Sequence, residues 1–164
     1  MVQQYIPKSI HITPGNTPGN TLSNCPMKQI TWKDVGVENG FPLISPGYVT
    51  DPSSKLLFSS GCVGTDANNE LPEDLEQQAR NAMRNLQTVL ETSGSSLSHV
   101  LKVLLFVSDP GYAGVVNKVF KEFFPNQPAR SCIVVSFPNN KLKVELECIA
   151  EIPKQKKKKR WFKL

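Results

Sequence analysis

The residues of this 164-residue chain best suited to chemistry are Arg130 and two later glutamates, Glu145 and Glu147. Arg130 precedes an apolar run at 131–137, and the glutamates alternate with apolar residues in 143–149. A Pro-Asn-Asn turn between these runs predicts a hairpin that holds the cation and the carboxylates within reach of one cleft. Because a guanidinium is always charged and its planar fork matches a carboxylate, Arg130 suits a small anionic ligand. The alternative is a structural ion pair between Arg130 and one of the glutamates.

Two helices are predicted to position these residues. Between Pro72 and Gly94, apolar residues recur every three or four positions, which is typical of an amphipathic helix. A shorter helix with the same periodicity is predicted at 112–123 and ends before Pro125. The segment 100–107 is apolar except for its lysine, which predicts a strand buried on both faces.

With a strand at 56–60 and a partner strand within 41–50, the predicted order is β-β-α-β-α-β-β. Right-handed crossovers then place both helices on one face of a mixed sheet. One set of side chains in the last strand is predicted to pack under the helices: Val144, Leu146, Cys148 and Ala150. The opposite set, with Glu145, Glu147 and Ile149, is left uncovered, so this face is predicted to be an interface between copies of the chain.

The two ends of the chain differ from its middle. Residues 1–28 contain few large apolar side chains and a tandem Pro-Gly-Asn repeat, which predicts a flexible arm before a domain at 29–153. Seven of the 19 basic residues lie in 154–164, a segment predicted to be a disordered basic tail that contacts an anionic surface or an import receptor. The remainder has 12 basic and 14 acidic residues, a net charge of −2, which argues against nucleic-acid binding by the domain.

Metal and membrane sites are not expected. The four cysteines show no C-x-x-C spacing and have no neighbouring histidine, so we do not expect a zinc site. Cys148 follows the apolar alternation of its strand and is predicted to be an inert buried thiol. Neither a membrane-spanning run nor a signal or transit pattern is evident, which favours a cytoplasmic or nuclear location.

Several motifs occur together in a characteristic order: Leu57–Gly61, Gln78–Leu86, Gly94–Leu97, Val100–Val107, Val116–Phe120 and Pro128–Cys132. On these motifs the chain from about 43 to 152 resembles the RidA/YjgF family of reactive-intermediate deaminases, small trimeric enzymes that hydrolyse imines and enamines of 2-keto acids. The resemblance implies a chorismate-mutase-like α+β fold, a homotrimer with ligand sites between subunits, a small carboxylate substrate and no cofactor.

The resemblance also implies roles for individual residues. Arg130 would anchor the carboxylate of the substrate, the backbone of Cys132 would add polar contacts, and Glu145 would orient the attacking water. Further substrate-binding positions are implied for Gly61, Asn117, Phe120 and Tyr48. Structural alternatives stay open for three of these residues, namely a simple turn for Gly61, a helix-surface amide for Asn117 and an intersubunit salt bridge for Glu145.

Two departures from the family pattern affect the expected pocket wall. Residues 45–50 read Ser-Pro-Gly-Tyr-Val-Thr where the family usually has Gly-Pro-Tyr-Ser-Gln, and Cys62 replaces a glutamine. A one-residue slip at the altered turn would rotate Tyr48 to the opposite face. The leading expectation is an imine deaminase. The alternatives are a catalytically reduced member that binds carboxylates as a sensor or partner protein, and a nucleic-acid-associated module.

Overall fold

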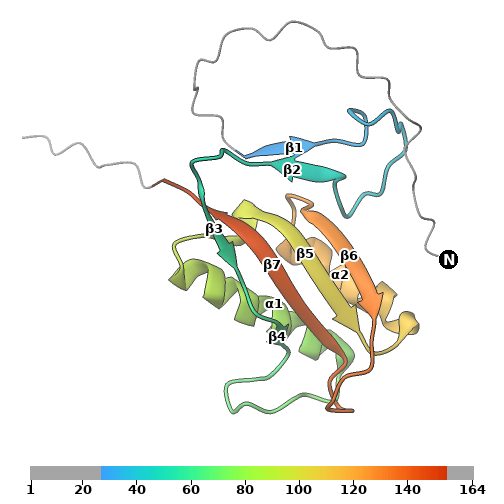
Figure 1. Ribbon diagram of the computed structural model, residues 1–164. Coiled ribbons are helices and arrows are strands. Elements are labelled where there is room, and N and C mark those ends of the chain that lie inside the picture. Colours follow the sequence, from blue (N-terminus) through green and yellow to red (C-terminus); the bar gives the residue numbers. More distant parts are fainter. Residues whose placement is uncertain (1–26, 155–164) are drawn as a thin grey trace, which may run out of the picture.

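The computed structural model describes residues 27–154, so most of the predicted arm and the tail beyond Lys154 lie outside the described residues. The described part consists of a mixed sheet with two helices on one face and a small hairpin at one end of the sheet (Figure 1). The predicted α+β fold is therefore confirmed. The elements in chain order are β1 Lys28–Ile30, β2 Gly47–Val49, β3 Lys55–Phe58, β4 Cys62–Val63, α1 Leu75–Thr92, η1 Leu97–His99, β5 Val100–Val107, η2 Pro110–Tyr112, α2 Ala113–Phe123, β6 Ala129–Val134 and β7 Val144–Ile152.

The strand order corrects the predicted hairpin. The main sheet runs β3-β7-β5-β6, with β4 also paired to β7, so β5 lies between β6 and β7. Strand β6 pairs with β5 in parallel, whereas β7 pairs with the other edge of β5 in antiparallel orientation. The chain leaving α2 makes a crossover to one side of β5, and the segment after β6 carries the chain to its other side. The hairpin predicted from 131–137 and 143–149 is therefore wrong.

The N-terminal strand prediction also requires correction. Within 41–50 only Gly47–Val49 forms a strand, and it pairs with β1 rather than with the strand at 55–58. The resulting hairpin is held by the connection between α2 and β6. The Tyr48 hydroxyl donates to the main-chain oxygen of Asn126, and Gln127 Nε2 donates to the oxygen of Pro42 at 2.7 Å. The hairpin thus lies against the segment that leads into Arg130.

Both predicted helices are confirmed. Asp74 caps α1, because its Oδ1 accepts a hydrogen bond from the Gln77 amide at 2.7 Å. Gly94 follows the helix with φ +79°, a left-handed conformation that glycine adopts without strain. Most apolar side chains of α1 and α2 are buried in the core, and the rings of Phe120 and Phe124 stack at 4.5 Å between centroids.

The core contains the predicted face of β7. Its buried side chains are Val144, Leu146, Cys148 and Ala150. Burial raises the pKa of the Cys148 thiol to about 11, in line with an inert thiol.

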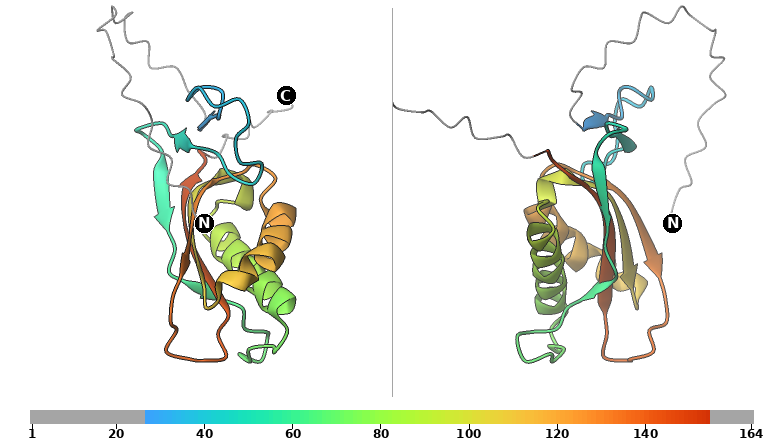
Figure 2. Two further views of the ribbon diagram at one scale, coloured as in Figure 1. Left: turned by 90° about the vertical axis from the view of Figure 1, so that its right-hand side faces the viewer. Right: turned by 60° about the vertical axis from the view of Figure 1, so that its left-hand side comes forward.

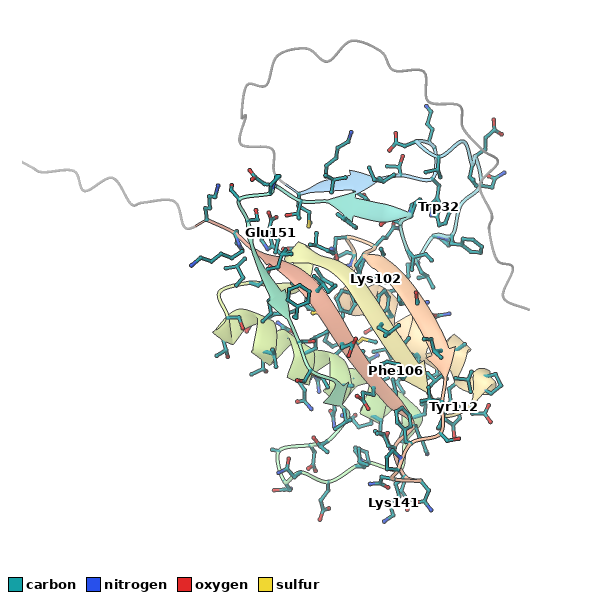
Figure 3. The ribbon with its side chains drawn as sticks, in the orientation of Figure 1. Trp32, Lys102, Phe106, Tyr112, Lys141 and Glu151 are labelled. Atoms are coloured by element: carbon teal, nitrogen blue, oxygen red, sulfur yellow. The ribbon has the colours of Figure 1, made fainter. Side chains whose placement is uncertain are left out.

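The other face of the sheet carries no layer of the described chain, and Figure 2 shows both helices on the same side of the sheet. Phe58 is 69% exposed there, and Ile133 is 43% exposed. Strand β5 is buried only toward the helices, since Lys102 and Phe106 are half-buried on the uncovered face (Figure 3). The prediction that β5 is buried on both faces is therefore wrong within a single chain.

Candidate functional site

Arg130 lies on the helix side of the sheet. In the parallel register it pairs with Val103, which is fully buried under the helices. Its guanidinium carbon lies 4.4 Å above the centre of the Phe120 ring, and Nη2 donates to Asn117 Oδ1 at 2.7 Å. Strand β6 and helix α2 thus bring together three of the residues predicted to bind substrate. We name Arg130, Asn117 and Phe120 the Arg130 half-site.

The charge of Arg130 is not compensated within the described chain. Nη1 is buried and has no hydrogen-bond partner, and no carboxylate of residues 27–154 lies within 4.0 Å of the guanidinium. Burial lowers the pKa of Arg130, because desolvation disfavours the charged form. A buried donor without a partner costs about 1–3 kcal/mol, so the half-site is suited to an incoming anion.

The carboxylates predicted to share a cleft with Arg130 lie on the other face of the sheet. Val103 pairs with both Arg130 and Cys148, so these three residues share the helix side. Glu145 is three positions from Cys148 on β7 and therefore faces the uncovered side. Two strand spacings, about 10 Å, also separate β6 from β7. Within one chain the predicted common cleft, and the alternative ion pair with Glu145 or Glu147, are both wrong.

Glu145 instead packs against Gly61. Strand β4 pairs Val63 with Glu145, and a Cβ atom on Gly61 would overlap Glu145 Oε1. Gly61 is therefore required for the close approach of the carboxylate, because any side chain there would collide with it. The Glu145 side chain makes no hydrogen bond or ion pair within 27–154. Burial and the nearby Glu145 raise the pKa of the Cys62 thiol. Gly61, Cys62 and Glu145 form what we name the Glu145 half-site.

Cys132 and Tyr48 occupy different surroundings. Cys132 pairs with Leu105, so it shares the helix side with Arg130, but it is exposed on the edge strand. Burial of its thiol raises the pKa of Cys132, and the Arg130 charge opposes this shift. The Tyr48 hydroxyl is bonded to Asn126, and no contact joins it to Arg130 in the structure. Burial raises the pKa of Tyr48. Tyr48 thus holds the hairpin in place.

The sequence analysis did not predict a polar pair on the uncovered face, Lys102 and Ser131. Lys102 Nζ donates to Ser131 Oγ at 2.9 Å, and burial lowers the pKa of this lysine. Lys102 is labelled on β5 in Figure 3. The sequence contained an indication of this site, because Lys102 is a single lysine in the otherwise apolar segment 100–107. Such a pattern indicates that one face of the strand carries a polar group.

Residues 27–154 contain neither a metal-binding cluster nor a helix suited to cross a membrane. No group of three or more His, Cys, Asp or Glu side chains in 27–154 is arranged to hold a metal ion. Over the same range, neither helix has the length and apolar character that a membrane crossing requires.

Comparison with known proteins gives consistent matches. The family model described as endoribonuclease L-PSP matches residues 46–152. The RutC family protein UK114 of Drosophila melanogaster is 34% identical over 128 residues, covering 76% of this chain and 92% of that protein. The 2-iminobutanoate/2-iminopropanoate deaminase of Escherichia coli K12 is 28% identical over 123 residues, covering 72% and 96%. The crystal structure of E. coli TdcF with bound serine has a TM-score of 0.56 and 28% identity, covering 68% of this chain and 90% of that one.

Proposed function

Since the chain belongs to the RidA/YjgF family matched by the endoribonuclease L-PSP model, we propose that it hydrolyses 2-imino and enamine acids to 2-keto acids and ammonia. The observation that carries this proposal is the buried Nη1 of Arg130, which has no partner in the described chain. Similarity to a 2-iminobutanoate/2-iminopropanoate deaminase supports the same class of substrate.

The Arg130 half-site has the features of a carboxylate anchor. Asn117 holds Nη2 and the Phe120 ring supports the guanidinium plane, while Nη1 has no partner in the described chain. A carboxylate that accepts from this donor replaces an unpaired buried group with a charge-assisted hydrogen bond. Arg130 fixes the substrate by its acid group and leaves the adjacent imine carbon to react.

The reaction needs only water and a group that transfers a proton. Water adds to the carbon of the protonated imine and loses a proton to Glu145, which gives a neutral carbinolamine. Glu145 returns this proton to the nitrogen, the C–N bond breaks and its electron pair leaves with ammonia. The remaining hydroxyl gives its proton to Glu145 as it becomes the keto oxygen. A carboxylate near the water suffices for this general acid–base role.

Assembly of the site requires a second copy of the chain. The Arg130 half-site and the Glu145 half-site lie on opposite faces of the sheet, so one chain does not bring them to one ligand. We propose a homotrimer in which the Arg130 half-site of one copy meets the Glu145 half-site of the next. Closing a ring would also cover Phe58 and Ile133, which are exposed on the single chain.

A carboxylate-binding protein without turnover is the second candidate function. Two observations favour it. The Tyr48 hydroxyl donates a hydrogen bond to the main-chain oxygen of Asn126, and Cys62 stands where the family has glutamine. We do not extend the proposal to RNA cleavage, because residues 1–153 carry 12 basic and 14 acidic residues, and a net charge of −2 does not favour binding to a phosphate backbone.

The test is release of 2-keto acid from imino acids generated in place by oxidation of an amino acid. The full chain should accelerate this release over the spontaneous reaction, whereas Arg130→Ala should lose both acceleration and the binding of benzoate. Benzoate binding without acceleration would favour the second candidate. Failure of the full chain to bind any carboxylate would reject both.

A further inference from the structure

A cavity of about 450 Å³ lies between helix α1 and the segment that joins β4 to α1, and it is open to solvent at the exposed side chains of Asp66, Gln77 and Arg84. Its volume falls in the range of about 300–1,000 Å³ typical of small-molecule sites. The residues of the Arg130 and Glu145 half-sites do not line it. The side chains that give it chemical character are Asp66, Gln77, Asn81, Arg84 and Asn85.

A ladder of amide side chains fixes the wall of the cavity. Gln77, Asn81 and Asn85 follow each other at intervals of four along α1 and therefore lie on one face of the helix. Gln77 Nε2 donates to Asn81 Oδ1 at 2.8 Å, and Asn81, only 8% exposed, donates to the main-chain oxygen of Gly64 at 3.3 Å. Asn85 Nδ2 donates to the oxygens of Val63 and Thr65 at 2.9 and 3.2 Å. These hydrogen bonds hold residues 63–65 against α1, so specific contacts fix the wall of the cavity.

These bonds use the three amide nitrogens and the Asn81 oxygen, and leave the other two amide oxygens available. Within the described chain, Gln77 Oε1 and Asn85 Oδ1 accept no hydrogen bond. Asp66 Oδ1 accepts the main-chain N–H groups of Asn68 and Glu70 at 2.8 and 3.0 Å, whereas Oδ2 has no partner among residues 27–154. The acceptors offered to a ligand are therefore two amide oxygens and one carboxylate oxygen.

Arg84 supplies a positive charge to the same cavity. Its guanidinium forms no hydrogen bond or ion pair with the residues described, and no ion pair joins it to Asp66 across the cavity. An anion alone would be repelled by Asp66, and a metal ion would be repelled by Arg84. A ligand with an acid group and an ammonium group close together satisfies both charges and the free oxygens.

We propose that this cavity binds a free α-amino acid. Its carboxylate pairs with Arg84, and its ammonium group donates to Asp66 Oδ2 and to the free oxygens of Gln77 and Asn85. The site is separate from the proposed deaminase site and does not depend on it.

Three probes of similar size test this proposal on the full chain: L-alanine carries both groups, pyruvate lacks the ammonium group and ethylamine lacks the carboxylate. Binding is followed by backbone amide chemical shifts. L-alanine should shift amides in 65–67 and 77–85, and pyruvate and ethylamine should bind there at least tenfold more weakly. Equal binding of ethylamine would show a simple cation site, and absence of shifts with L-alanine would show no site. Either result overturns the proposal.

Variants separate this site from the Arg130 half-site. Arg84→Gln should weaken L-alanine binding at α1 at least tenfold, whereas Lys121→Gln, which removes an exposed positive charge from α2, should leave it unchanged. Arg130→Ala should abolish benzoate binding yet preserve the L-alanine shifts. If Arg84→Gln binds L-alanine as well as the unmodified chain, the assignment is wrong even where the deaminase proposal holds.

Discussion

The Arg130 half-site and the Glu145 half-site belong to the same sheet but differ in how far a single chain completes them. Nη1 of Arg130 is buried, and the guanidinium rests on Phe120 and is held by Asn117. The carboxylate of Glu145 lies on the uncovered face, where the missing side chain of Gly61 gives it room and no described residue bonds to it. A single chain thus preorganises the proposed anion anchor, whereas in our proposal the proton-transfer group is completed only when another copy covers it.

The largest effect is expected from breaking the uncovered face. Phe58 pairs with Ile149, shares this face and is 69% exposed. Phe58→Lys should convert the proposed trimer into monomers, since a buried unpaired charge is costly at an interface, and turnover should be lost with assembly. Sedimentation checks the mass. The control has to lie away from the uncovered face, so Leu56→Lys is not suitable. Val89→Lys on α1 serves instead, because Val89 is a partly exposed helix residue. An unmodified chain that is monomeric at micromolar concentration would contradict the trimer.

The next effect separates the two half-sites chemically. Glu145→Gln retains the shape of the side chain but removes the proton acceptor, so turnover should fall about 100-fold or more. Benzoate binding should stay within about twofold of the unmodified chain, because the proposed anion contact is made by Arg130 and not by Glu145. Single-turnover release of keto acid and a benzoate titration give the two numbers. A variant with full turnover would show that Glu145 has no part in proton transfer.

Changing the anchor itself should give a smaller loss. Arg130→Lys keeps the positive charge but removes the planar fork and the second donor, so carboxylate binding should weaken by about 1.5–3 kcal/mol, or about 10- to 150-fold. Thermal unfolding should show the fold intact. Benzoate titration checks the affinity, and unchanged binding would show that the anion binds elsewhere.

The neutral partner of Arg130 offers a pH-dependent test. Asn117→Asp places a carboxylate 2.7 Å from Nη2, where it would compete with the ligand for the guanidinium. Benzoate binding at pH 7 should weaken about tenfold. As the pH falls through the pKa of the introduced carboxyl, that group becomes neutral and binding should recover toward the unmodified chain. If affinity relative to the unmodified chain at the same pH does not recover even below the pKa of the introduced carboxyl, the effect is purely steric.

The parts of this fold that local patterns encode were predictable. The periodicity between Pro72 and Gly94 marks α1, and the apolar run at 100–107 marks β5 with the bounds that the structure has. The alternation in β7 correctly divided its side chains between the core and the uncovered face. These features depend on spacing along the chain, which the sequence contains directly.

The position of Arg130 relative to Glu145 was not predictable in this way. It depends on β5 lying between β6 and β7, and strand order is decided by how buried strands share partners across the whole sheet. The cluster of Arg130 with Asn117 and Phe120 came from the family resemblance, because the periodicity of α2 alone does not indicate where β6 lies. The unpaired state of Nη1 required the three-dimensional arrangement of every neighbouring acid.

The smallest effect on turnover is expected outside the two half-sites, at the basic C-terminal segment. Residues 155–164 lie beyond the described part, while Lys154 donates to Ser53 Oγ at 2.7 Å and is best left in place. We expect that deletion of 155–164 leaves turnover and benzoate binding unchanged, because both half-sites lie within 27–154, but moves a fluorescent fusion away from the nucleus or an anionic surface. Replacing the five basic residues at 156–160 with glutamine keeps the length and should redistribute the fusion in the same way. If truncation and the glutamine variant both lower turnover, the charges of the tail contribute to the site. The site would then have three parts: the Arg130 half-site, the Glu145 half-site of another copy and the basic segment.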